Sequence, residues 1–220
     1  MTNPARTVRV AVLGTSAAYA AALYTSGVRL DGITKQVLAY LPAIAALLVL
    51  AFDLWIWKWP LIHRAVNRPR IDGTWLTTLK PSADSHIPPG GNRGPIRTAV
   101  MIDQTYWSVS TTLLSPESRS YSTSAAIRPN GGSRTQAVLA YTYQNEPAQE
   151  HRPRSQPHSG ATEFHISGRH PDEMTGTYWT ARLTTGDMHA RRLNRRTDYP
   201  NLAAVLEDSG PALGVPPIPQ

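Results

Sequence analysis

The first sixty residues contain two long runs of uncharged, mostly apolar positions. No charged residue lies between Arg9 and Arg29, and none lies between Lys35 and Asp53. A helix of about 20 mostly apolar residues is long enough to cross the hydrocarbon layer of a bilayer. The pattern therefore predicts two transmembrane helices, which cover approximately residues 10–28 and 36–57.

Only a short glycine-containing turn separates the two runs, so residues 1–60 are expected to form a helical hairpin, with residues 61–70 as a juxtamembrane linker. Arginine and lysine gather before the first run and after the second, and positive residues favour the cytoplasmic side. This bias predicts a multi-pass anchor with the N-terminus and the remaining chain in the cytoplasm. The competing interpretation is a signal peptide cleaved after Ala20, which would place the rest outside.

Small residues recur at every fourth position of the first run: Gly14, Ala18, Ala22 and Ser26. Such spacing forms a groove that lets two helices approach closely. One interpretation is a self-association surface between copies of the chain, built on Gly14, Ala18 and Ala22. The other is packing against the second helix of the same hairpin, and the spacing fits both equally.

From Ile71 onward the apolar positions alternate with a period of two. Segments rich in Thr, Val, Tyr and Trp are separated by turn residues, as in antiparallel sheets. The pattern predicts an all-β domain over residues 71–195, built as an up-and-down barrel or a sandwich. Its eight expected strands are 73–79, 96–103, 107–114, 118–128, 136–145, 161–167, 174–183 and 187–193.

Between these strands we expect hairpin turns at 130–132 and 185–187. Two proline-rich segments, 81–95 and 146–159, are long for hairpin connections and are interpreted either as lid or mouth loops or as disordered segments. Residues 196–220 are expected to form a flexible tail with one helical turn.

The segment that begins at Ser118 alternates serine with larger residues, which places Ser118, Ser120, Ser122 and Ser124 on one face. If this face points inward, the serines line a wet cavity, and an eight-stranded barrel is wide enough for one small ligand. If it points outward, they meet bulk water instead. The segment 139–145 poses the same choice, because Leu139, Tyr141, Tyr143 and Asn145 share one face.

Composition excludes several kinds of chemistry. The chain has no cysteine, which rules out disulfides, thiol catalysis and thiolate zinc sites. Motifs for nucleophilic hydrolysis, metalloproteases and phosphate-binding loops are missing. The excess of basic over acidic residues, 22 against 15, is spread along the chain, so no DNA or RNA polymer is expected as a partner.

Histidine is the remaining candidate for metal binding or hydrolysis. Four histidines fall close together in sequence, but their spacing does not match a helical ligand pair: His151, His158, His165 and His170. We therefore predict no enzyme activity, no catalytic residue, no cofactor and no metal. A tethered hydrolase built on His158 or His165 stays open as an alternative.

The β-rich part does carry groups that suit a nucleotide. Aromatic side chains can stack on bases, arginine can pair with phosphates, and amides can read base edges. Each of these residues also has a structural interpretation as core, surface or turn. The candidates of this kind are Trp75, Trp107, Tyr143, Trp179, Arg97, Arg119, Arg182, Gln104 and Asn145.

Six short motifs behind a helical hairpin give the chain a family resemblance. They are IDGTW at 71–75, DQTYW at 103–107, the alternating serine strand, YTYQNEP at 141–147, HSGAT at 158–162 and MTGTYWTAR at 174–182. In this order the chain resembles the effectors of CBASS, the cyclic-oligonucleotide-based antiphage signalling systems of bacteria, with two N-terminal transmembrane helices and a β-strand-rich domain. The resemblance covers nearly the whole chain to about Arg192.

The resemblance implies a compact, lipocalin-like barrel of about eight strands that binds a cyclic oligonucleotide, usually a cyclic dinucleotide, made by a partner nucleotidyltransferase. It implies that binding drives self-association and disruption of the bacterial inner membrane, with the lipid bilayer as the target and cell death as the result. The ligand-binding residues carried over by matching motif are Trp75, Gln104, Ser120, Tyr143, Asn145, His158 and Arg182. One departure is Ala161, which follows Gly160 where a threonine is expected.

The main alternative is a membrane-anchored barrel for a lipophilic ligand. It predicts that the serine face points outward and that Tyr141 and Tyr143 line an oily cavity.

Overall fold

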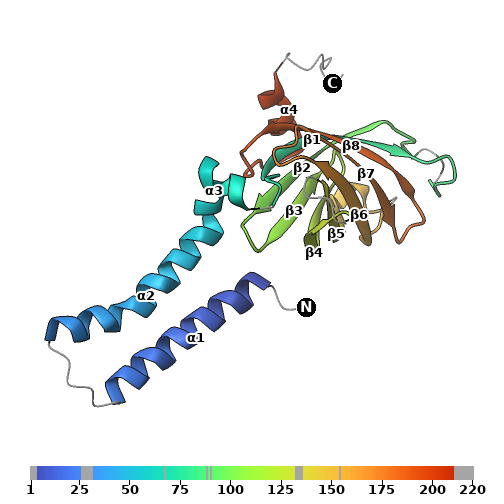
Figure 1. Ribbon diagram of the computed structural model, residues 1–220. Coiled ribbons are helices and arrows are strands. Elements are labelled where there is room, and N and C mark those ends of the chain that lie inside the picture. The colour runs from blue at the N-terminus through green and yellow to red at the C-terminus, as the bar shows by residue number, and fades with distance from the viewer. Residues whose placement is uncertain are drawn as a thin grey trace. The chain divides into compact units, whose positions relative to one another are not determined.

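The computed structural model describes residues 4–25, 32–66, 68–87, 89, 91–131, 136–153 and 155–210. The chain divides into two compact units, each of which is described by itself (Figure 1). The first contains residues 1–68 together with 105–108, and the second contains 69–104 and 109–220.

The first unit is helical. Helices α1 (Pro4–Thr25) and α2 (Gly32–Leu54) lie at the predicted positions, followed by a 3₁₀ turn (Ile56–Lys58) and the short helix α3 (Pro60–Ala65). The Ser16 hydroxyl of α1 donates to the Pro42 carbonyl of α2 at 3.1 Å, so the two helices contact one another. Across the residues that the structure describes, no helix has both the length and the apolar character to cross a membrane. Helices α1 and α2 thus confirm that the two apolar runs are helical over their described residues.

The small-residue positions of α1 are exposed. Gly14, Ala18 and Ala22 all lie on the surface of the helix, and a Cβ atom built at Gly14 would meet nothing within 4 Å. The contact with α2 uses Ser16 instead. Packing inside the hairpin therefore does not account for these three positions, while self-association stays a prediction.

The C-terminal end of α2 is held by a buried carboxylate. Asp53 is fully buried, its Oδ1 accepts from the backbone N–H of Trp107 at 3.1 Å, and its carbonyl accepts from Tyr106 at 2.9 Å. The Phe52 ring lies edge-on to Tyr106, with ring centroids 4.9 Å apart. Asp53 thus orders the segment 105–108 within the helical unit.

The second unit is a closed barrel of eight antiparallel strands in sequence order, β1 to β8, which confirms the up-and-down barrel and excludes the sandwich (Figure 1). Every predicted strand is present, with ends that differ by a few residues. The strands are β1 (Gly73–Pro81), β2 (Ile96–Gln104), β3 (Val109–Leu114), β4 (Ser118–Pro129), β5 (Gln136–Pro147), β6 (His158–Ser167), β7 (Glu173–Thr180) and β8 (Thr185–Asn194).

One predicted turn is wrong. Residues 185–187 belong to β8, where Gly186 pairs with both Tyr178 and Pro81. A Cβ atom at Gly186 would approach the Lys80 carbonyl oxygen to 2.3 Å, so glycine serves close strand approach here rather than a turn. The turn itself lies at 181–184, where Leu183 has a φ of 61°.

The side chains that point into the barrel are apolar and closely packed at one end, and they leave a cavity at the other end. The end at which the chain enters contains a buried apolar core that includes Trp75, Val100, Ile102, Leu139, Phe164, Ile166 and Met188. Residues nearer the opposite end of the same strands turn polar or aromatic, as at Asn145 and Tyr143 of β5. The barrel is therefore packed at one end and hollow at the other.

The start of the predicted tail is ordered. Asn201 caps helix α4 (Leu202–Ser209) by accepting from the Ala204 N–H, and Val205 is fully buried. Helix α4 forms a second apolar cluster with Ala99 and Met101 on the outward face of β2. The predicted helical turn is confirmed, but residues 196–210 are not a flexible tail; residues 211–220 lie outside the described part.

Candidate ligand-binding site

A cavity of about 660 Å³ occupies the open end of the barrel. This is within the range of pockets that bury small-molecule ligands. The two proline-rich segments contribute Ile87, Pro89 and Ser155 to its lining, as expected for mouth loops. Both apolar and hydrogen-bonding side chains line the wall, among them Leu79, Leu113, Ser118, Ser120, Tyr141, Tyr143, Asn145, His158, Thr162, Tyr178 and Arg182.

Three of the predicted site residues are direct neighbours across the strands. Ser120 pairs with Asn145, and Asn145 pairs with His158, so β4, β5 and β6 present them side by side. The Ser120 hydroxyl donates to Asn145 Oδ1 at 2.9 Å, and both residues are about 95% buried. The row is preorganised, because the sheet register fixes the backbone and the hydrogen bond fixes the side chains.

The next row toward the core is built from Tyr143 and Gly160, which are also cross-strand partners. A Cβ atom at Gly160 would lie 2.4 Å from the Tyr143 hydroxyl oxygen and 2.7 Å from the Trp179 carbonyl oxygen. Glycine at this position therefore lets the Tyr143 ring lie flat against β6. Burial raises the pKa of Tyr143, so the hydroxyl is neutral and available as a donor.

The floor of the cavity is a third row, in which Tyr141, Thr162 and Tyr178 are successive cross-strand partners. Burial raises the pKa of Tyr141 to about 12 and also raises that of Tyr178. Tyr178 and Thr162 were not among the predicted site residues. For Thr162 the available signal was its period-two spacing from His158 along β6.

Basic groups stand at the mouth of the cavity. Arg182 donates from Nη1 to the Ser155 hydroxyl at 2.9 Å. His158 Nδ1 lies 2.9 Å from the Gln156 carbonyl oxygen. Burial, and then the nearby charge of Arg182, lower the pKa of His158 from its ordinary value of 6.5. Glu117 also lines the cavity, so the mouth carries both signs of charge.

The four serines of β4 do not all share one face: the first ones point into the barrel and the last one points outward. Ser118 and Ser120 line the cavity, and the Ser122 hydroxyl accepts from the Thr111 N–H at 2.9 Å. The register then shifts between Ser122 and Ser124, and Ser124 is exposed. A β-bulge reverses which face points inward, and beyond it Ala125 and Ile127 pack against the core.

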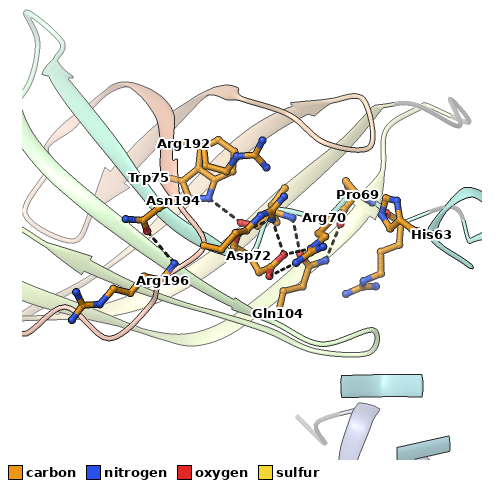
Figure 2. A network of polar contacts seen from close by, with 12 residues as sticks. His63, Pro69, Arg70, Asp72, Trp75, Gln104, Arg192, Asn194 and Arg196 are labelled. Carbon is orange, nitrogen blue, oxygen red and sulfur yellow. Dashed lines mark hydrogen bonds and ion pairs between the residues drawn. The ribbon is translucent and has the colours of Figure 1, made fainter. Parts of the chain in front are cut away.

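Trp75 and Gln104, two of the predicted ligand-binding residues, do not line the cavity. Both residues lie at the opposite end of the barrel from the cavity, where they hold the segment by which the chain enters the barrel (Figure 2). Gln104 Oε1 accepts from the Ile71 N–H, and Nε2 donates to the Pro69 carbonyl, both at 2.8 Å. Trp75 is fully buried and donates from Nε1 to the Ile71 carbonyl at 2.9 Å.

Asp72 completes this network. Its carboxylate accepts from Arg70 at 2.9 Å and from Arg195 at 2.8 Å, so it ties the entering segment to the chain beyond β8 (Figure 2). The IDGTW motif is thus largely structural in this barrel.

The four histidines do not converge. His158 lines the cavity, His165 is exposed on β6 and His151 lies in a short 3₁₀ turn. Within the described part of the chain, no three His, Asp or Glu side chains are grouped closely enough to hold a metal ion.

A closed antiparallel barrel with a core at one end and a preorganised cavity at the other defines a ligand-binding β-barrel. A family model described as "Cap15, cyclic dinucleotide receptor domain" matches residues 66–192, and the chain belongs to this family. It is 28% identical over 158 residues to "CD-NTase-associated protein 15" of Staphylococcus schleiferi, a match that covers 72% of this chain and 80% of the relative. These findings confirm the resemblance to CBASS effectors that the motifs predicted.

Proposed function

We propose that this protein is a membrane-acting CBASS effector whose barrel binds a cyclic dinucleotide, and whose helices then assemble and disrupt the bacterial inner membrane. The observation that carries the proposal is the row of Ser120, Asn145 and His158 inside the cavity of a cyclic dinucleotide receptor barrel. The chain acts by binding and assembly rather than by catalysis.

The cavity wall supports binding of a nucleotide over a purely lipophilic ligand. Tyr141 and Tyr143 offer aromatic faces, which can stack on bases, while Ser120, Asn145 and Arg182 offer hydrogen-bonding groups beside them. The lipophilic alternative predicts outward serines, yet Ser120 points into the cavity.

Membrane action is supported by the surface of the helices. Large apolar side chains stand exposed on α1 and α2, among them Leu13 at 61%, Leu47 at 65% and Leu48 at 59%. Exposed apolar patches of this kind mark surfaces that meet a membrane or a partner. In the proposal they contact lipid at the cytoplasmic membrane, with the barrel in the cytoplasm, and the exposed positions Gly14, Ala18 and Ala22 join copies of the chain.

The test uses the full chain in detergent micelles. Its thermal melt is recorded with cyclic dinucleotides and with the matching linear dinucleotides. A ligand that binds only the folded state raises the free energy of unfolding, by about 2.7 kcal/mol when its concentration is a hundred times Kd, and Tm rises with it. A rise with a cyclic species alone supports the proposal, and release of a dye from liposomes on its addition tests membrane disruption. A folded protein whose Tm responds to no cyclic dinucleotide contradicts it.

A further inference from the structure

The side-chain amide of Asn145 has a fixed orientation inside the cavity. The Ser120 hydroxyl donates to Asn145 Oδ1 at 2.9 Å, across directly paired positions of β4 and β5. The oxygen of the amide is therefore held toward β4. No described residue accepts a hydrogen bond from Nδ2, although Asn145 lines the cavity and is only 6% exposed.

Asn145 Nδ2 is thus a hydrogen-bond donor whose position is already fixed before a ligand enters the cavity. Nδ2 requires an acceptor, and Oδ1 keeps a second lone pair that can accept from a neighbouring donor. His158, the next residue in the row, adds an acceptor. Because a carbonyl only accepts, its Nδ1 must carry the proton that it shares with the Gln156 oxygen, and the neutral ring presents Nε2 as an acceptor.

We propose that Asn145, oriented by Ser120, is the specificity-determining residue of the cavity and reads an adenine base of the cyclic dinucleotide. This inference rests on the proposed function. Adenine carries a ring nitrogen acceptor beside its amino donor on both of its hydrogen-bonding edges. Guanine presents two acceptors, N7 and O6, on the edge where adenine presents an acceptor and a donor. The fixed amide and His158 Nε2 therefore match adenine on either edge and guanine on one.

The sharpest test is Asn145→Asp. A carboxylate has the same shape but only accepts, so it repels the ring nitrogens of adenine and accepts from the N1–H and amino group of guanine. Affinities of the full chain in detergent are measured by titration calorimetry for cyclic di-AMP, cyclic GMP–AMP and cyclic di-GMP. We expect the wild-type protein to favour cyclic di-AMP over cyclic di-GMP, because adenine matches the amide on both edges and guanine on only one. The preference should shrink or reverse in Asn145→Asp.

Two further variants separate reading from folding. Ser120→Ala frees the amide to rotate, and should lower the adenine preference more than it lowers overall affinity. Gln144→Glu is the matched control, since it makes the same change of charge on the neighbouring residue of β5, which does not line the cavity. Its ligand preference should equal that of the wild type.

The outcomes distinguish the two proposals. If the wild type binds all three ligands equally, or if Asn145→Asp weakens all three by the same factor, Asn145 is not the reading residue while the sensor function stands. If no cyclic dinucleotide binds to the folded wild-type protein, the proposed function itself fails, and the inference with it.

Discussion

At the scale of single residues, the cavity depends on one glycine. Gly160 leaves room for the Tyr143 ring, since a Cβ atom there would lie within 2.4 Å of the hydroxyl oxygen and 2.7 Å of a backbone oxygen of β7. Gly160→Ala should destabilise the fold by about 1–3 kcal/mol, the usual cost of overpacking, and push Tyr143 into the ligand space. Thermal melts and ligand titration measure the two effects. The neighbouring exposed Ser159→Ala is the control, and unchanged affinity in Gly160→Ala would contradict this role of the glycine.

His158 gives the cavity a dependence on pH. Its pKa is lowered by burial and by Arg182, so the folded protein holds it neutral at pH 7. In the ligand-free protein, its contribution to stability is present above pH 6.5 and is lost as the pH falls, because the unfolded chain takes up the proton more readily. Only the neutral ring offers Nε2 as an acceptor, so a ligand that donates to it binds the neutral form.

Affinity for a cyclic dinucleotide should therefore fall as the pH drops below about 6.5, the ordinary histidine value, because protonation removes this acceptor. Calorimetric titrations between pH 5.5 and 8 measure this slope. His158→Gln keeps a polar side chain without titrating, and should give a flatter profile. An equal slope in both proteins would assign the proton to another group.

At the scale of elements, the entry of the chain into the barrel explains Trp75 and Gln104, two residues that were predicted to bind the ligand. Gln104 satisfies the Ile71 N–H and the Pro69 carbonyl, and Trp75 satisfies the Ile71 carbonyl. Gln104→Ala leaves buried backbone groups unpaired, at a cost of about 1–3 kcal/mol. We expect a lower Tm, but the same ligand-induced rise in Tm as in the wild type. A normal Tm with a lost ligand response would instead place Gln104 in the binding site.

Period-two alternation was enough to locate all eight strands, because each strand has one face in the barrel and one outside. The family motifs, and not the alternation, predicted Ser120, Asn145 and His158 as ligand-binding residues, and His158 fell in a segment interpreted as a loop although it begins β6. The roles of Gln104 and Trp75 could not be predicted, since their partners are backbone groups, which leave no mark in the sequence. The bulge after Ser122 could not be predicted either, because the extra residue in the strand is not marked by any particular residue type.

At the scale of the whole molecule, the proposed function requires two surfaces that act in turn. A ligand shifts an equilibrium only if it binds one state better than the other, so the messenger must favour the assembled chain. The cavity lies within the barrel unit, while the exposed small residues Gly14, Ala18 and Ala22 lie on α1 of the helical unit. Binding and assembly should therefore be separable by mutation.

Ala18→Leu tests this separation. A large side chain in the middle of the small-residue stripe prevents two helices from approaching closely, so ligand-induced oligomers and liposome leakage should both be lost. The cavity is untouched, so the ligand should raise Tm as it does in the wild type. Ala20→Leu is the matched control, because two helical residues further on the side chain faces away from the stripe and is also exposed. Chemical cross-linking of the full chain in liposomes, with and without a cyclic dinucleotide, measures assembly. Full cross-linking and leakage in Ala18→Leu would show that copies meet elsewhere, while equal loss in both variants would mean that added bulk alone impairs the helix.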